Sequence, residues 1–285
     1  MIPDIEIRQR ARSDDVEPVI VERDYVLGWL LAGCSQLSAG KKVCVFKGGT
    51  CLRKCYFSDY RFSEDLDFTL TARLSLGDVE AMLREAARWA EEASGIRFTE
   101  RTIRSQVLLE GTSQETYRFK FYYRGPHRQL GDPSSIKVDL TYNERILLPP
   151  LERPLDHPYS DKEDQGQVSI LCYTLEEVLV EKVRGVSGQR LYPISRDPFD
   201  IDQLIKRGVD LARASEILIE KCGLKGVKIE AVSTQALSDR KNVFKVDWEN
   251  NLSYLLPAHL RIPFEESWQG MLNGVESLRR RISLQ

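Results

Sequence analysis

The chain has 285 residues, which is enough for one large domain or two modest ones. Its net charge is -2 and its pI is about 6.1, so overall positive charge does not indicate non-specific nucleic-acid binding. The first residues lack the apolar core of a signal peptide, and no stretch approaches the roughly 18 apolar residues of a membrane span. The sequence therefore predicts a soluble, cytoplasmic protein.

The cysteine and histidine pattern does not predict a zinc site. The six cysteines form no CxxC pair and the three histidines are scattered, whereas zinc sites are built from closely spaced ligands. We expect free thiols in a reducing compartment. The cysteines are Cys34, Cys44, Cys51, Cys55, Cys172 and Cys222.

The N-terminal region is predicted to contain one long helix. The charged opening, to about Asp15, is interpreted as a loosely attached arm. Valines and leucines at three-to-four spacing predict a helix over Glu17–Leu37. The polar run Glu22–Tyr25 inside it is interpreted as a solvated face with local charge pairs.

The segment Val43–Leu70 carries most of the chemistry. It predicts, in order, a strand at Val43–Phe46, a turn at Gly48-Gly49, a helix at Thr50–Tyr56 and a strand at Asp65–Thr71. Alternate residues of a strand point to the same face. Asp65 and Asp67 should therefore project together, while Leu66 and Phe68 face the core.

The later segments predict a sheet followed by helices. Asp78 is the expected N-cap of a helix to Ala93 that ends at Gly95, and Thr174 with Glu177 forms a capping box. Further strands are expected at Ile96–Leu109, Thr116–Tyr123 and Ser135–Tyr142, and further helices at Leu175–Val186, Asp200–Lys206, Leu211–Lys221, Ser233–Asp239 and Phe264–Arg281. The proline-rich stretch 146–166 is interpreted as a linker or a loop lying across the first domain.

Two aspartates of the second strand are candidate metal ligands. Asp65 and Asp67 offer paired carboxylates of the kind that hold Mg²⁺ in nucleotidyl transfer. Asp139, in a later strand, is the candidate third carboxylate. Surface strands also carry alternating acids without any metal, so the pair alone is a weak signal.

The Gly48-Gly49-Thr50 turn is a candidate phosphate site. Glycines between a strand and a helix let the backbone approach a phosphate, and the Thr50 or Ser63 hydroxyl can add a hydrogen bond. The alternative is an ordinary tight turn, and the spacing excludes a Walker motif. The combination with the nearby acids favours a triphosphate-plus-metal site.

A second charged cluster follows more than a hundred residues later. Lys182, Arg190 and Arg196 could neutralise or hold phosphate. The alternative is a charged helix surface, with an Arg–Asp pair joining two helices.

Several motifs, in order from about residue 20 to 207, resemble the AbiEii-type nucleotidyltransferases, the toxins of abortive-infection and related toxin–antitoxin pairs, which include the MenT toxins. The matching segments are Glu22–Tyr25, Phe46–Lys54, Arg61–Phe68, Lys137–Leu140, Leu175–Lys182, Gln189-Arg190 and Arg196–Asp200. Val180 and Val183 stand where the family pattern suggests Ala and Leu.

The resemblance implies an α+β fold: a polymerase-β-like nucleotidyltransferase core with a mixed sheet over residues 1–168, then a mostly helical domain over 169–285 that completes the nucleotide cleft. It implies that Asp65 and Asp67 bind Mg²⁺ or Mn²⁺, with Asp139 in the third acidic position. It also implies a structural role for Arg23 and Asp24. It further implies triphosphate contacts from Gly48, Gly49, Ser63 and Lys182, and support from Asp197 or Asp200.

The implied activity is transfer of a nucleoside monophosphate from an NTP, in the family to the 3′ end of tRNA, which blocks translation. A cognate antitoxin is the implied protein partner. Transfer to a protein or a small molecule, and a non-catalytic nucleotide- or antitoxin-binding module, are the alternatives. The candidate basic face for RNA consists of Arg101, Arg104, Arg118, Lys120 and Arg124.

Overall fold

The computed structural model describes residues 1–37, 43–98, 104–110, 114–127, 130–142, 144–190 and 192–283. The chain divides into two compact units. The first unit contains Met1–Glu144, Pro150–Cys172 and Pro257–His259, and the second contains Arg145–Pro149, Tyr173–Leu256 and Leu260–Gln285. Within the described ranges, no helix is both long and apolar enough to cross a lipid bilayer.

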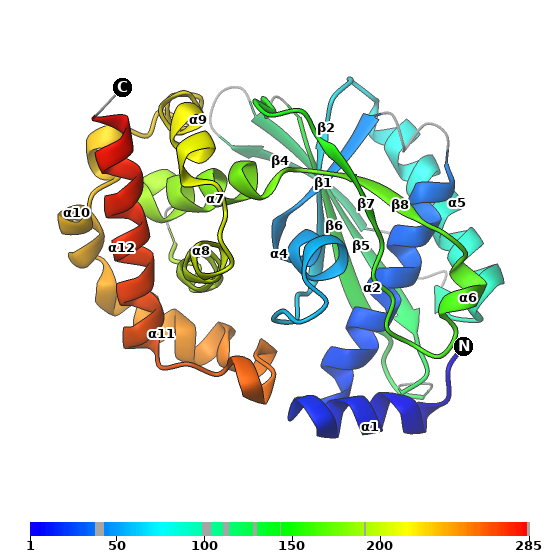
Figure 1. The fold of residues 1–285 in the computed structure, drawn as a ribbon. Coiled ribbons are helices and arrows are strands. Elements are labelled where there is room, and N and C mark those ends of the chain that lie inside the picture. The colour runs from blue at the N-terminus through cyan, green and yellow to red at the C-terminus, as the bar shows by residue number, and fades with distance from the viewer. Residues whose placement is uncertain are drawn as a thin grey trace. The chain divides into compact units, whose positions relative to one another are not determined.

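The first unit is built on a mixed sheet, which confirms the predicted fold class (Figure 1). Its strands run in the order β3-β5-β6-β2-β1-β8-β7, and β4 also pairs with β5. The pairs β2–β6 and β1–β8 are parallel, and the others are antiparallel. The strands are β1 (Cys44–Lys47), β2 (Asp65–Leu70), β3 (Arg97–Phe98), β4 (Arg104–Glu110), β5 (Gln114–Arg124), β6 (Ser134–Thr141), β7 (Leu151–Pro154) and β8 (Ser169–Cys172).

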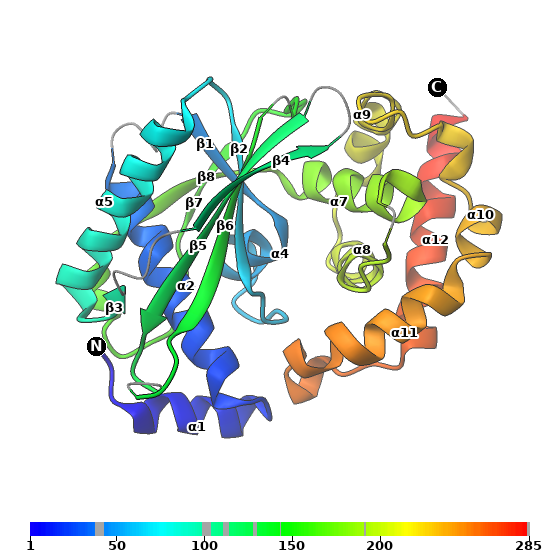
Figure 2. The ribbon, with the colours of Figure 1, turned by 180° about the vertical axis from the view of Figure 1, so that it is seen from behind.

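Helices α2 (Pro18–Gln36) and α5 (Leu76–Ser94) cover the apolar face of this sheet (Figure 2). Phe68 of β2 and Leu140 of β6 are neighbours on that face, and both border a cavity also lined by Leu31 and Leu83 of the two helices. Because strand residues alternate in direction, Asp67 and Asp139 lie on the opposite face. The core thus fixes which face carries the acids.

The ends of α5 follow its sequence signals, with one correction. Ser75 is the N-cap, and its hydroxyl accepts a hydrogen bond from the Asp78 backbone N–H at 3.1 Å. The prediction of Asp78 as the N-cap was therefore wrong, because Asp78 is the third helical residue and completes the capping box. Gly95 ends the helix in the left-handed conformation, as predicted.

Two segments predicted as irregular are ordered elements. The opening forms helix α1 (Asp4–Asp14), which buries Ile7 and Ala11. The interpretation of this segment as a loosely attached arm was therefore wrong. The stretch 146–166 contains strand β7, paired with β8 at the edge of the sheet, and the short helix α6 (Lys162–Gln165). The burial of α1 against α2 and the pairing of β7 with β8 depend on contacts between elements, which local composition does not reveal.

The second unit is helical. Thr174 caps its first helix, accepting a hydrogen bond from the Glu177 N–H at 3.2 Å. The last helix, α12, packs on α8 and α9. The α-helices are α7 (Leu175–Arg184), α8 (Arg196–Lys206), α9 (Leu211–Gly223), α10 (Thr234–Ser238), α11 (Lys241–Asn251) and α12 (Phe264–Ile282), with shorter turns at Gly185–Gln189, Ile229–Ala231 and Ser253–Leu255. The sequence analysis did not predict α11.

Candidate active site

A row of four charged residues crosses the face of the sheet opposite α2 and α5. In the strand registers, Lys47 of β1 pairs with Asp67 of β2, Asp67 with Asp139 of β6, and Asp139 with Arg118 of β5. Neighbouring strands lie about 4.8 Å apart, so the acids are adjacent. Asp65 lies two residues before Asp67 and shares its face. The pairing thus brings the three predicted carboxylates together.

Arg118 holds the third carboxylate of this group. Its Nε donates to Asp139 Oδ1 at 2.9 Å and its Nη2 to Oδ2 at 2.6 Å, a two-point contact. This hydrogen bonding raises the pKa of the Arg118 guanidinium, and nearby Asp65 and Asp67 act in the same direction. Arg118 was predicted to lie on an RNA-binding face, and its pairing with Asp139 was not predicted. The alternation of residues along two strands could have suggested it, but their register could not be read.

Gly48 and Gly49 pack directly against charged side chains. Gly48 has a φ of +80°, and a Cβ there would lie 2.6 Å from Asp67 Oδ2. A Cβ on Gly49 would lie 2.4 Å from Arg61 Nη2. A side chain at either position would therefore displace the charged group beside it. Gly48 allows the backbone to come close to the Asp67 carboxylate, and Gly49 allows it to come close to the Arg61 guanidinium.

The helix that follows the turn is short and changes its hydrogen-bonding pattern. Helix α4 (Gly48–Cys51) continues into a π-helical turn, η1 (Leu52–Tyr56). Thr50 is buried, and its hydroxyl donates to the backbone carbonyl of Asp65, which ties α4 to β2. Ser63 is also buried, two residues before Asp65. The Thr50 hydroxyl is thus occupied by a structural bond in this conformation.

The polar run Glu22–Tyr25 is buried rather than solvated, so that interpretation was wrong. Asp24 forms ion pairs with Arg53 at 2.7 Å and Lys54 at 2.6 Å, and it accepts a hydrogen bond from the Tyr159 hydroxyl at 2.8 Å. Burial alone would raise the pKa of Asp24, but the charges of Arg53 and Lys54 outweigh it and lower the pKa well below its usual value. These partners tie α2 to the segment after the Gly-Gly turn.

Arg23 and Arg53 connect α2 to the loop before β2. Arg23 forms an ion pair with Glu64, next to Asp65. The Arg53 guanidinium lies 3.8 Å from the centre of the Phe62 ring and also donates to the Tyr60 carbonyl. Charged residues of α2 and η1 therefore position the loop that carries Ser63 and leads to the acids. This geometry agrees with a structural role for Arg23 and Asp24.

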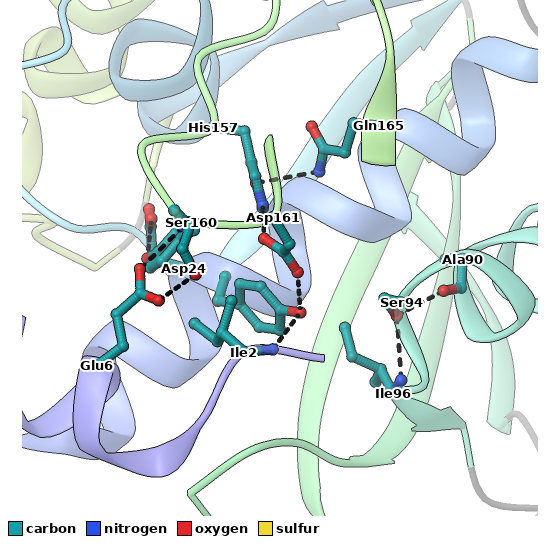
Figure 3. Close-up of polar contacts among 12 residues, drawn as sticks. Ile2, Glu6, Asp24, Ala90, Ser94, Ile96, His157, Ser160, Asp161 and Gln165 are labelled. Carbon is teal, nitrogen blue, oxygen red and sulfur yellow. Dashed lines mark hydrogen bonds and ion pairs between the residues drawn. The ribbon is translucent and has the colours of Figure 1, made fainter. Parts of the chain in front are cut away.

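A buried network of hydrogen bonds around His157 lies beside Asp24 (Figure 3). His157 Nε2 is 3.0 Å from Asp161 Oδ1, and its Nδ1 is 3.0 Å from the Gln165 side-chain nitrogen. Because the carboxylate only accepts and the amide nitrogen only donates, this pattern assigns the neutral ring with its proton on Nε2. Burial lowers the pKa of His157. Tyr25 completes the network by donating to Asp161 Oδ2 at 2.7 Å.

The second unit contains the Lys182 cluster. Lys182 is buried, and its Nζ lies 3.0 Å from Asp197 Oδ1 and 2.6 Å from Asp200 Oδ2. Arg190 also bonds to Asp197, while Arg196 is half-buried at the start of α8. The alternative of a charged helix surface was wrong for Lys182, but an Arg–Asp pair does join this region to α8.

The sequence analysis missed a buried ion pair in the same unit. Lys221 of α9 and Glu177 of α7 are both fully buried, and their charged atoms are 2.6 Å apart. Glu177 also accepts hydrogen bonds from the backbone of Leu147 and Leu148, rather than closing the predicted capping box. From the sequence alone, a glutamate at the third helical position could close a capping box or form a buried ion pair. The position of α9 decides between the two.

The predicted basic face is only partly described. Arg101 and the side chain of Arg104 lie outside the described residues. Lys120 follows Arg118 on the same face of β5, and the register places it beside Lys137 of β6. Arg124, near the end of β5, is half-buried. Lys120 and Lys137 thus lie two residues along their strands from Arg118 and Asp139.

The acids fit a hard divalent ion. Asp65, Asp67 and Asp139 are half-buried, and their carboxylates supply the oxygen ligands that Mg²⁺ and Mn²⁺ prefer. The absence of a side chain on Gly48 keeps the space beside Asp67 Oδ2 open. Arg118 engages both oxygens of Asp139, so it competes with a metal ion for this third carboxylate.

Comparison with protein families gives a match over most of the chain. Residues 29–274 match the family model described as nucleotidyl transferase AbiEii toxin of a type IV toxin–antitoxin system. No curated protein sequence matches.

Solved structures share the fold. MenT4, a nucleotidyltransferase toxin from Mycobacterium tuberculosis H37Rv, is 19% identical with a TM-score of 0.66, and the match covers 100% of this chain and 94% of MenT4. JHP933 from Helicobacter pylori is 14% identical with a TM-score of 0.57, covering 95% of this chain and 96% of JHP933. At these identities the likeness establishes the architecture alone.

Proposed function

Because the chain belongs to the AbiEii family of nucleotidyl transferase toxins, we propose that it transfers a nucleoside monophosphate from an NTP to an acceptor hydroxyl, using Mg²⁺ held by Asp65 and Asp67. The observation that carries the proposal is the register of Asp67 with Asp139, next to the Gly48 backbone. Three carboxylates beside an open glycine turn are the arrangement that metal-assisted nucleotidyl transfer needs.

In the proposed reaction, the acceptor oxygen bonds to the α-phosphorus as the bond to the β-phosphate bridging oxygen breaks. Pyrophosphate leaves, and the hydroxyl proton passes to a base. The bound metal would neutralise the negative charge that develops on the phosphate oxygens. Asp139 can take the proton on a remaining lone pair, because Arg118 contacts each of its oxygens without using all of their lone pairs.

The remaining predicted site residues have proposed roles in binding the NTP. The Gly48 and Gly49 backbone and the Ser63 hydroxyl are proposed to contact the triphosphate, as is Thr50 through its backbone N–H. Lys182 is proposed to hold phosphate, with Asp197 and Asp200 orienting its ammonium group. Arg190 and Arg196 are proposed as further phosphate contacts.

The proposed acceptor is the 3′ end of tRNA, and the proposed consequence is blocked translation, countered by a cognate antitoxin. Support comes from the lysines beside the acids, because Lys120 and Lys137 lie next to each other on the same face. Positive charge there would attract an RNA backbone towards the carboxylates. Protein and small-molecule acceptors remain as outcomes of the test below.

The test is a transfer assay with α-labelled ATP, GTP, CTP and UTP, each with Mg²⁺ and either total tRNA or cell protein. We expect label in tRNA, released by removal of the terminal nucleotides. Label found only in protein would rule out tRNA as the acceptor but would still support nucleotidyl transfer. No label in any macromolecule, with no pyrophosphate release, would contradict the transferase.

Asp67→Asn is the matched test of the metal site. Loss of one metal-binding carboxylate should lower the rate by at least about 100-fold, since metal stabilisation of charge amounts to several kcal/mol. Thermal unfolding is measured in parallel, so that a loss of rate in a folded variant is assigned to the metal site. Glu85→Gln, which removes an exposed charge from α5, serves as the control and should leave both properties unchanged.

Expression of the protein without an antitoxin separates catalysis from binding. The wild type should arrest growth, and Asp67→Asn should not. If Asp67→Asn arrests growth equally, a non-catalytic binding module explains the toxicity.

A further inference from the structure

Three cysteines that are separate in the sequence meet in the first unit. The sulfur atoms of Cys51, Cys55 and Cys172 all lie within 4.8 Å of one another, and the three residues are buried free thiols. Three metal-ligating atoms at this spacing, shielded from water, are a candidate metal centre. It is distinct from the aspartate row, which offers only oxygen ligands.

Three elements bring these thiols together. Cys51 ends α4, and Cys55 lies in the π-helical turn η1, which closes with a 2.8 Å bond from the Phe57 N–H to the Leu52 carbonyl. Cys172 ends β8, where it pairs with Phe46 of β1. Single π-turns within helices are frequent at functional sites. The sequence analysis found no metal set because Cys172 joins only through the parallel β1–β8 pairing.

We propose that Cys51, Cys55 and Cys172 bind one Cu(I) ion. Thiolates are soft ligands and select soft ions such as Cu(I). Structural zinc is almost always four-coordinate, and within the described part of the chain this group offers three ligands. Cu(I) accepts three sulfur ligands in a plane, so it suits the set better than zinc.

Positive charge lies close to Cys55. Lys54 precedes it in η1, and Arg153 of β7 donates to the Cys55 carbonyl at 3.2 Å. Binding follows Cu⁺ + 3 RSH → [Cu(SR)₃]²⁻ + 3 H⁺, with no change of oxidation state. The nearby cations offset part of the resulting negative charge.

The test is an anaerobic titration of the full chain with Cu(I), supplied as its acetonitrile complex in competition with a colorimetric Cu(I) chelator. We expect one tightly bound ion per chain, and X-ray absorption showing three sulfur neighbours. Cys172→Ala should lose this site and weaken binding by at least about 100-fold, while Cys222→Ala, a buried thiol of the second unit, should retain it.

Circular dichroism and thermal unfolding must show that Cys172→Ala is folded. If it is not, Cys51→Ala replaces it with the same expectation. Equal Cu(I) binding by the wild type and a folded cluster variant would overturn the proposal, as would two sulfur neighbours or no binding to the fully reduced protein.

Discussion

Arg118 bonds to both carboxylate oxygens of Asp139, while Asp139 lies opposite Asp67 in the parallel pairing of β2 with β6. One positive charge therefore engages the third acid of a group whose other two members, Asp65 and Asp67, lie on the neighbouring strand β2. A divalent ion and Arg118 compete for the same oxygens. In this structure, the Asp139 carboxylate is hydrogen-bonded to Arg118 through both of its oxygens.

Arg118→Gln should strengthen metal binding, because it removes the competing guanidinium. We expect Mn²⁺ to bind at least about tenfold more tightly than to the wild type, since a unit charge a few ångströms away changes the binding free energy by one to a few kcal/mol. Electron paramagnetic resonance of free Mn²⁺ measures this directly.

Lys120→Gln is the control for Arg118→Gln. It removes the same charge from the same face of β5, but the described contact of Lys120 is with the Tyr122 ring rather than with an acid. If both variants tighten Mn²⁺ binding equally, general charge explains the effect and the Arg118–Asp139 pair does not.

Gly48→Ala should impair both stability and activity. The alanine must adopt a φ of +80°, which costs roughly 1–2 kcal/mol, and its Cβ would also displace the Asp67 carboxylate. Gly208→Ala isolates the first effect, because Gly208 has a φ of +79° with open space around it. Urea unfolding and the transfer assay should show a stability loss in both variants and an activity loss in Gly48→Ala alone. Full activity in Gly48→Ala would mean that Asp67 is not needed in its present position.

Asp24→Asn should destabilise the first unit by about 3–5 kcal/mol, because it leaves Arg53 and the buried Lys54 without their shared counter-charge. Glu80→Gln breaks the exposed Glu80–Arg84 pair and should cost less than about 0.5 kcal/mol. Denaturant unfolding compares the two. A similar small loss in both would show that the Asp24 cluster contributes little beyond a surface pair.

Asp24 also predicts a loss of stability in acid. Its pKa is lower in the folded protein than the unfolded value of about 4, so its contribution is complete above that value. As the pH falls below about 4, the unfolded state takes up the proton first and the contribution is lost. The unfolding free energy of the wild type should therefore drop more steeply in this range than that of Asp24→Asn. Parallel pH profiles would contradict this.

The lowered pKa of His157 predicts a second loss of stability as the pH falls, in a range above that of Asp24. Burial lowers its pKa in the folded protein, so the unfolded state binds a proton first as the pH falls below about 6.5. The unfolding free energy should decline between about pH 6.5 and 5 in the wild type. His157→Gln cannot titrate and should lack that slope, although its stability at pH 8 will be lower because the ring packs against Trp29 and Tyr25. A slope that persists in His157→Gln would assign it to another group.

The comparison of sequence with structure is clearest in the segment Val43–Leu70. A strand, a glycine turn, a short helix and a second strand were predicted there, and β1, α4 with η1, and β2 follow that order. These are local patterns: alternation on a strand, and glycines where the chain must turn. The same alternation correctly placed Leu66 and Phe68 in the core and the two acids on the other face.

Local patterns could not decide which distant residues become partners. The approach of Asp139 to Asp67, the pairing of Arg118 with Asp139, and the burial of Asp24 against Lys54 all depend on strand register and helix packing. The sequence by itself determined the family resemblance, the candidate acids and the helical second half. Only the tertiary structure decided which charges neutralise one another and which thiols meet, because ion pairing and burial depend on distances of a few ångströms between segments far apart in the chain.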